Sequence, residues 1–229
     1  MGRNQDALRL LTTAYRLFRR LDARVDLVHV GGKVAELEGT FLALVREWGQ
    51  SIETCDTYTF GHCERVARNA VAMARELGLD EQEETTILLG AYLHDLGKVR
   101  VPHEILNKPG PLTAAEREVV RQHPIWGIEI LANVEFPWDL KPIIRWHHER
   151  CDGTGYPDRL VANEIPVAAQ IVGIWDVYDA LTTTRPYQAA FSPEQALVEI
   201  SRCRGWWSPK VFAAFQTIMT QRVGTEPPP

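Results

Sequence analysis

Apolar residues recur at steps of three and four along most of this 229-residue chain, and almost no stretch alternates between polar and apolar residues. The first spacing places side chains on one face of an α-helix, whereas alternation would indicate a strand. Two such stripes lie in the first fifty-odd residues, on either side of a helix break that is expected at Gly31-Gly32. They consist of Leu8, Leu11, Tyr15, Phe18 and Leu21, and of Leu37, Phe41, Leu44, Trp48 and Ile52. The chain is therefore predicted to be all-α.

Residues that begin and end helices are spread through the rest of the chain. They are Asp80 with Glu83 and Thr113 with Glu116 as capping boxes, Ser192-Pro193 and Ser208-Pro209 as N-caps followed by proline, and Gly78 as a left-handed stop. Two segments rich in glycine and proline, 99–112 and 151–166, are predicted to be loops. The pattern predicts a helical bundle at residues 50–222, with residues 1–49 as an N-terminal helical extension or linker and 223–229 as a flexible tail.

The composition excludes several classes of protein. There are 25 lysines and arginines against 30 aspartates and glutamates, and the net charge of -5 argues against nucleic-acid binding, which leaves a basic footprint. No apolar run approaches the roughly 18 residues that span a bilayer, and the first residues lack the apolar segment of a secretory signal. The four cysteines form no C-x-x-C pair. A cytoplasmic protein with free thiols and no membrane span is therefore expected.

Five of the seven histidines and two aspartates stand in short signatures that mix apolar and titratable residues. They are His62, His94, His123, His147 and His148, with Asp95 and Asp176. A neutral imidazole whose second nitrogen is held by another group binds metal ions, and a carboxylate can bridge two cations. Burying so many titratable groups without a metal would be costly, so they are predicted to meet in a two-metal pocket inside the bundle. The other two, His29 and His103, are interpreted as hydrogen-bonded core residues.

Several ordered segments resemble the HD-GYP subfamily of the HD phosphohydrolase superfamily, over about residues 50 to 216. They are the H…HD…D order of His62, His94-Asp95 and Asp176, and the runs HDLGKVRVP, LNKPGPLT, HHERCDGTGYP and DVYDALTTTRPY. The resemblance implies an HD-superfamily helical bundle. It also implies a phosphodiesterase that hydrolyses cyclic di-GMP, a bacterial second messenger, to linear pGpG and in some cases on to GMP. Its cofactor would be a bi- or trinuclear iron or manganese centre.

Carried over to these positions, the resemblance implies a specific set of ligands. His62, His94, Asp95 and Asp176 would hold one ion, and Asp95 would bridge to a second ion held by His123, His147 and His148. A hydroxide that bridges the two ions would attack phosphorus. Trinuclear members have a glutamate where this chain has Tyr58, so two divalent transition metals, Fe or Mn, are expected rather than three.

Four further residues are candidates for catalysis or substrate binding. Lys98, one helical turn beyond His94, is placed to meet a phosphate oxygen, although by itself it could equally be a solvated lysine at a helix end. The resemblance assigns Tyr156 and Arg185 to the substrate; without it they would be a packing residue and a surface cation. Asp179 could cap a helix, orient another side chain or touch the guanine base.

Other functions and partners remain open at this stage. The sequence does not identify the residues that bind the base, so another cyclic dinucleotide such as cyclic GMP-AMP could be the substrate. A second alternative is a receptor or protein-interaction module that binds the dinucleotide, or a diguanylate cyclase, with little turnover. Loss of metal-ligand residues would favour this alternative, but none of them is missing from the sequence. The N-terminal helices are expected to pack on the bundle, and the alternative is that they transmit the state of an upstream sensory module or form a homodimer.

Overall fold

The computed structural model describes residues 2–22, 28–53, 61–134, 136–184 and 189–223. Within these ranges the regular elements are helices, and the one strand-like feature is an isolated bridge between Asp152 and Val161. The elements are α1 (Gly2–Asp22), α2 (Val28–Glu53), α3 (His62–Glu76), α4 (Glu81–Leu93), η1 (Leu96–Arg100), α5 (His103–Leu106), α6 (Ala114–Val120), α7 (His123–Ile130), α8 (Lys141–Trp146), η2 (Ala162–Glu164), α9 (Val167–Thr182), α10 (Pro193–Arg202), η3 (Arg204–Trp206) and α11 (Pro209–Val223). The all-α prediction is confirmed.

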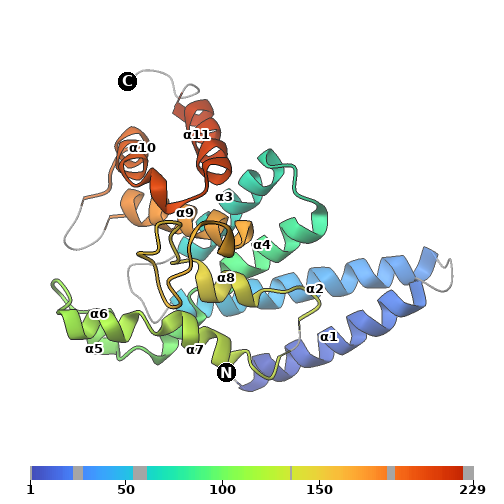
Figure 1. Cartoon of the computed structure of the whole chain (residues 1–229). Helices are drawn as coiled ribbons and strands as arrows, with labels where there is room; N and C mark the ends of the chain where they lie inside the picture. Colours follow the sequence, from blue (N-terminus) through green and yellow to red (C-terminus); the bar gives the residue numbers. More distant parts are fainter. Residues whose placement is uncertain (1, 23–27, 54–60, 135, 185–188, 224–229) are drawn as a thin grey trace.

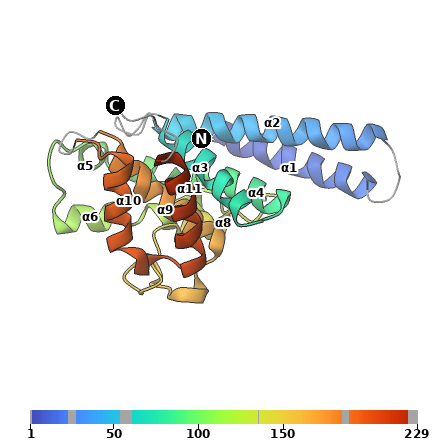
Figure 2. The same ribbon diagram turned by 90° about the horizontal axis from the view of Figure 1, so that it is seen from above.

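Helices α3, α4 and α9 form the centre of the bundle, and α8, α10 and α11 pack around them (Figure 1). Helices α1 and α2 lie side by side and extend away from the bundle as an N-terminal arm (Figures 1 and 2). Helix α2 also contacts α3 and α4, so one apolar core joins the arm to the bundle. Its fully buried side chains include Phe41, Leu89, Ile143, Trp175 and Phe215. Removal of this surface from water stabilises the fold.

The predicted helix ends are present where the structure describes them. The Asp80 carboxylate accepts a hydrogen bond from the backbone N–H of Glu83 at 2.8 Å, and the Glu83 carboxylate accepts one from the N–H of Asp80. Thr113 and Glu116 form the same reciprocal pair at the start of α6. Gly78, with φ of 70°, follows α3 in the left-handed conformation that glycine adopts without strain. Helices α10 and α11 begin at the predicted prolines.

The predicted helix break at Gly31-Gly32 is wrong, because both glycines lie inside α2. A glycine in a helix interior costs about 1 kcal/mol relative to alanine, which a long helix with extensive packing tolerates. The same helix buries Phe41, Val45 and Trp48 in the core, and this burial outweighs the two unfavourable positions.

The two segments predicted as loops differ in the structure. Residues 99–112 include the end of η1 and the four-residue helix α5, so the prediction of a continuous loop there is wrong. His103 begins α5 and is exposed, which also contradicts its interpretation as a core residue. The side chain of His29 lies outside the described residues. Residues 151–166 are mostly irregular, as predicted, with η2 as one short turn.

Helix α2 is continuous across residues 49 and 50, where the sequence places the start of the main domain. The domain limits remain predictions, and the predicted tail at 224–229 lies outside the described residues. Among the helices that the structure describes, none combines the length and the apolar character required to cross a membrane.

Candidate metal centre

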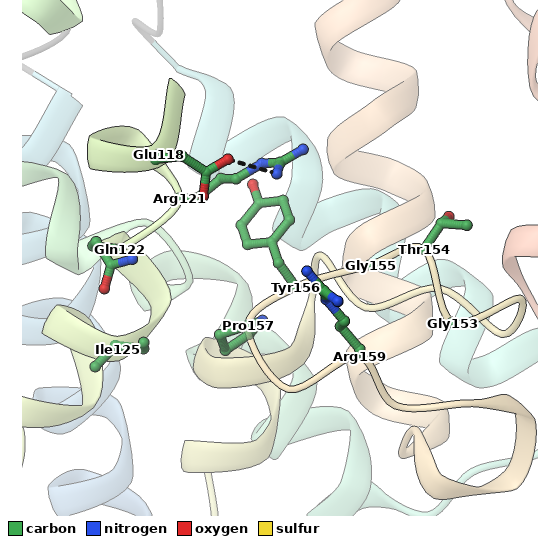
Figure 3. A pocket seen from close by; sticks show the side chains of 10 residues that line it. All are labelled: Glu118, Arg121, Gln122, Ile125, Gly153, Thr154, Gly155, Tyr156, Pro157 and Arg159. Carbon is green, nitrogen blue, oxygen red and sulfur yellow. Dashed lines mark hydrogen bonds and ion pairs between the residues drawn. The ribbon is translucent and has the colours of Figure 1, made fainter. Parts of the chain in front are cut away.

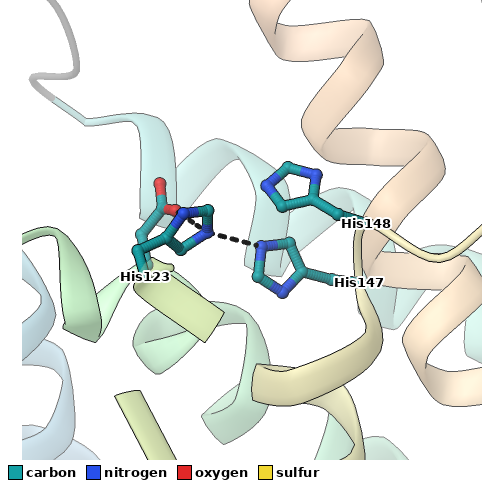
Figure 4. A group of neighbouring side chains, drawn as sticks. His123, His147 and His148 are labelled. Carbon is teal, nitrogen blue, oxygen red and sulfur yellow. Dashed lines mark hydrogen bonds and ion pairs between the residues drawn. The ribbon is translucent and has the colours of Figure 1, made fainter. Parts of the chain in front are cut away.

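Five segments bring the predicted ligands into one cluster of side chains. His62 is the first residue of α3, and His94-Asp95 joins α4 to η1. His123 begins α7, His147-His148 follows α8, and Asp176 lies in the middle of α9. The three histidines from the second half of the chain, His123, His147 and His148, face one another in Figure 4. The structure therefore places all seven predicted ligands together.

Backbone carbonyl groups hold three of the imidazole rings in one orientation. Nδ1 of His94 lies 2.7 Å from the Ala91 oxygen, and Nδ1 of His123 lies 2.8 Å from the Val120 oxygen. Nδ1 of His147 lies 3.1 Å from the oxygen of Ile144. A carbonyl oxygen can only accept, so each Nδ1 carries a hydrogen and Nε2 is the ring nitrogen available to a metal. This is the arrangement that prepares histidine to ligate a metal.

The ligand atoms fall into two groups that share a carboxylate. Asp95, His123, His147 and His148 form one group and His62, His94 and Asp176 the other, with the ligand atoms of each group within 4.8 Å of one another. Oδ1 of Asp95 lies 3.3 Å from Nε2 of His123, and Oδ2 of Asp95 lies 3.4 Å from Nε2 of His94. One oxygen of Asp95 therefore faces each group, which is the geometry of a bridging carboxylate.

Asp176 also lies between the two groups, a feature that the sequence did not predict. Its Oδ1 is 3.3 Å from Nε2 of His62, while its Oδ2 is 3.9 Å from Nδ1 of His148. Both carboxylates of the centre thus present one oxygen to each side.

The electrostatics of the centre favour a bound cation. Burial lowers the pKa of His123 to about 4 and that of His148 to about 3, so both rings are neutral at pH 7. Burial also acts to lower the pKa of His62, but hydrogen bonds with Asp176 and Asp179 outweigh it and raise the pKa to about 9. A positive charge is therefore stabilised between the aspartates. Neutral imidazole nitrogens with carboxylate oxygens are a donor set that fits divalent transition metals.

Lys98 contacts the shared carboxylate of Asp95. Its Nζ lies 2.7 Å from Oδ2 of Asp95, and its side chain is mostly buried. Burial acts to raise the pKa of Asp95, but Lys98 and His94 outweigh it and hold the pKa well below its usual value. The alternative, a solvated lysine at a helix end, is therefore not the arrangement observed.

The candidate centre opens into a cavity of about 370 Å³, which we call the metal cavity. Its lining includes Lys98, His123, His147, His148, Tyr156 and Asp176. The Tyr156 ring stacks on His148, with centroids 4.7 Å apart and an angle of 26° between the planes. Tyr156 thus stands at the edge of the cavity, where the resemblance assigns it to the substrate. Arg185 and Tyr58 lie outside the described residues.

Asp179 lies behind His62 rather than among the residues that line the metal cavity. Oδ2 of Asp179 is 2.7 Å from Nδ1 of His62, and Arg65 donates to both of its oxygens. Of the three roles left open by the sequence, the contacts are those of a residue that orients another side chain. Arg65 was missed, although its position one helical turn after His62 places it on the same face of α3.

Two buried glutamates hold the backbone beside the ligands. Glu53, at the end of α2, accepts hydrogen bonds from the N–H groups of Gly61 at 2.7 Å and Cys63 at 2.6 Å. No sequence signal pointed to it. Glu149 accepts three backbone hydrogen bonds at 2.6, 2.9 and 3.0 Å. They come from the loop residues Asp158, Arg159 and Leu160.

Comparison with known proteins supports the same family. The HD domain family model matches residues 50–211. Cyclic di-GMP phosphodiesterase PA4108 of Pseudomonas aeruginosa is 36% identical over 204 residues, which cover 86% of this chain and 48% of PA4108. The 3'3'-cGAMP-specific phosphodiesterase 2 of Vibrio cholerae is 36% identical over 174 residues, which cover 75% of this chain and 33% of that protein. The chain thus spans less than half the length of either relative.

A solved structure shows the same fold. Bd1817, a HDG"Y"P protein from Bdellovibrio bacteriovorus, superposes with a TM-score of 0.61 at 19% identity, over 95% of this chain and 70% of Bd1817. The family match covers most of the chain, and the fold and motifs agree with it. The chain therefore belongs to the HD domain family, and its relatives are consistent with the HD-GYP subfamily that its motifs resemble.

Proposed function

We propose that this chain is a metal-dependent phosphodiesterase that opens cyclic di-GMP to linear pGpG. The observation that carries the proposal is the pair of ligand groups that share Asp95, beside a cavity that Lys98 lines. The name of PA4108, a cyclic di-GMP phosphodiesterase, supports this choice of substrate. The chain spans part of that relative, so the activity of the whole protein belongs to the proposal.

Different residues of the chain bind the metal ions and the substrate in this proposal. The seven ligands fit two divalent ions, and we place Fe or Mn there because imidazole and carboxylate ligands suit these metals. Two such ions lower the pKa of a shared water and draw charge from a phosphate oxygen. Lys98 lies beside Asp95, the carboxylate that the two ligand groups share. From this position its ammonium group can contact a second phosphate oxygen as negative charge develops on that oxygen. Asp179 keeps the His62 ring in place, and Tyr156 bounds the space for the sugar or base.

Cyclic GMP-AMP is the second candidate substrate. The Vibrio cholerae relative, named a 3'3'-cGAMP-specific phosphodiesterase, is as similar to this chain as PA4108 is, at 36% identity in each case. The two substrates differ in one base, and we expect the ligand groups to bind phosphate rather than base. The metal centre is therefore compatible with both compounds.

The remaining partners stay proposals. A cyclic dinucleotide is an intracellular messenger, which places the proposed activity in the cytoplasm. A diguanylate cyclase, an upstream sensory module and a second copy of the chain are the partners predicted from the sequence. They are tested by copurification and by the mass of the protein in solution.

The proposed function is tested by anaerobic purification, metal quantification and product chromatography. Cyclic di-GMP and cyclic GMP-AMP are each supplied in the presence of Mn(II) or Fe(II), and the Asp95→Ala variant serves as the control. We expect about two ions per chain from the two ligand groups, and pGpG as the first product. Tight binding without any product from fully metallated protein would favour the receptor alternative instead. Preferential opening of cyclic GMP-AMP would establish the second candidate.

A further inference from the structure

A second cavity adjoins the metal cavity on the other side of the Tyr156 segment. It has a volume of about 380 Å³, close to the 370 Å³ of the metal cavity, and we call it the outer cavity. Its lining consists of Glu118, Arg121, Gln122, Ile125, residues 153–157 and Arg159. Tyr156 lines both cavities, so one aromatic side chain forms the boundary between them.

The outer cavity carries two cationic side chains. Figure 3 shows the guanidinium groups of Arg121 and Arg159 turned toward Tyr156, and the Arg121 Cζ lies 5.2 Å from the centroid of that ring. Glu118 forms an ion pair with Arg121 at 2.8 Å and is the one acidic residue of the lining. Two guanidinium groups against one carboxylate leave the cavity with a positive balance. The planar fork of arginine matches the geometry of phosphate oxygens.

Hydrogen bonds fix the backbone around Arg159 relative to the metal ligands. Glu149, the residue after the ligand His148, accepts the backbone hydrogen bond of Arg159 at 2.9 Å. Arg159 has φ of 58°, a left-handed conformation that strains a residue with a Cβ and persists only where its surroundings impose it. The neighbouring Asp158 accepts hydrogen bonds from two guanidinium nitrogens of Arg145, at 2.6 and 2.8 Å. The backbone position of Arg159 relative to the ligands is therefore defined before any substrate binds.

The chemistry of a cyclic dinucleotide matches the two cavities. Such a molecule has two phosphates and two nucleosides, and only one phosphate can lie over the metal ligands at a time. Ligand pockets usually measure about 300 to 1,000 Å³, so either cavity alone is near the lower limit. The other half of the ring must extend past Tyr156, and the outer cavity offers both space and positive charge there.

We propose that the outer cavity is a second anion subsite, in which Arg121 and Arg159 bind the phosphate that is not being cleaved. This proposal rests on the proposed hydrolysis of a cyclic dinucleotide. The two arginines act in substrate binding and leave the reacting phosphate to the metal centre. Glu118 competes with the ligand for Arg121 and so limits the affinity.

Isothermal titration of cyclic di-GMP, with calcium as a non-reactive ion where turnover interferes, tests the subsite directly. The Arg121→Gln/Arg159→Gln variant is expected to bind the dinucleotide at least about tenfold more weakly, because two charge-assisted contacts are lost. The Glu118→Gln variant is expected to bind more tightly. The matched control is Arg68→Gln, an exposed arginine of α3 outside both cavities, which should leave the affinity unchanged.

A small substrate with one phosphate tests the metal centre without involving the proposed subsite. Hydrolysis of bis(p-nitrophenyl) phosphate should be the same in the wild type and the double variant, whereas the KM for cyclic di-GMP rises in the variant. Equal affinity for cyclic di-GMP in the wild type and the double variant would overturn the subsite and leave the proposed function intact. Weaker binding by the variant in a protein that forms no product would retain the subsite and overturn the hydrolase. A wild-type protein that binds no cyclic dinucleotide would overturn both.

Discussion

Asp179 holds His62 from the side opposite to the metal centre. The two side chains meet at 2.7 Å, between Asp179 Oδ2 and His62 Nδ1, and this contact joins α9 to the first residue of α3. Asp176, one turn earlier on α9, faces Nε2 of the same ring at 3.3 Å. Two acids on one face of a helix therefore fix both nitrogens of one imidazole.

The Asp179→Asn variant is expected to bind metal less tightly than the wild type. An amide removes the negative charge that supports His62, and loss of such a partner typically weakens metal affinity about 10- to 100-fold. Competition with a fluorescent chelator measures the change. Asp139→Asn, at an exposed position, is the control and should match the wild type. Unchanged affinity in the Asp179 variant would show that the contact does not support ligation.

The Lys98→Met variant is expected to keep its metal and lose turnover. Methionine retains the apolar stem but removes the charge 2.7 Å from Asp95, and loss of one group that stabilises developing charge lowers kcat about 100- to 1,000-fold. Metal analysis and kcat for bis(p-nitrophenyl) phosphate are measured on the same sample. Lys108→Met, which instead breaks the ion pair with Glu116, controls for loss of a lysine. Loss of metal together with activity would assign Lys98 a structural role.

Gly97→Ala is expected to destabilise the protein and disturb the centre. A Cβ at Gly97 would overlap the carbonyl oxygen of His123, and it would lie 2.7 Å from the backbone nitrogen of Gly127. Backbone atoms cannot rotate away, so the cost should reach about 1 to 3 kcal/mol or more. Urea denaturation measures it, and Gly110→Ala, with open space around the added atom, is the control. Equal unfolding free energies for the two variants would show that η1 and α7 separate easily.

The capping box of α6 is expected to contribute a small, pH-dependent stability. Hydrogen bonds from Lys108 and Thr113 lower the pKa of Glu116 from 4.5 to about 2. A carboxyl group with a depressed pKa in the folded state stabilises above its unfolded pKa, so the contribution is present above about pH 4.5 and is lost as the pH falls toward 2. The difference in unfolding free energy between wild type and Glu116→Gln should therefore narrow from pH 6 to pH 3. The carboxyl group of Glu116 is partly exposed, so the difference in unfolding free energy is also expected to shrink in high salt. A difference that is constant across this pH range would exclude the charged form of Glu116 as its source.

Much of the candidate site could be predicted from the sequence because its ligands are titratable residues that stand next to apolar segments. His94 and Asp95 follow the apolar residues of α4, and a buried pair of this kind requires a partner. The resemblance to the HD-GYP subfamily also implied that Asp95 would lie between two groups, and the structure places its oxygens in that way. That Asp176 faces both groups depends on the rotation of α9 about its axis, which periodicity alone does not define. The roles of these residues as ligands remain predictions.

The features that were missed depend on contacts between distant segments. Glu53 is nine positions before His62, and its burial follows from the way α2 meets α3. The continuity of α2 through Gly31-Gly32 depends on packing along the whole helix, which local propensity does not describe. Capping boxes, in contrast, involve residues three positions apart, and both that were predicted are present.

The hydrogen bonds of Glu53 connect the N-terminal arm to the backbone on either side of His62. The residues on either side of His62, Gly61 and Cys63, are attached through their backbone to the last residue of α2. A shift or rotation of α2 must therefore either break two short hydrogen bonds or carry the His62 backbone with it. A displacement of α2 therefore reaches the edge of the candidate metal centre through a single side chain, that of Glu53.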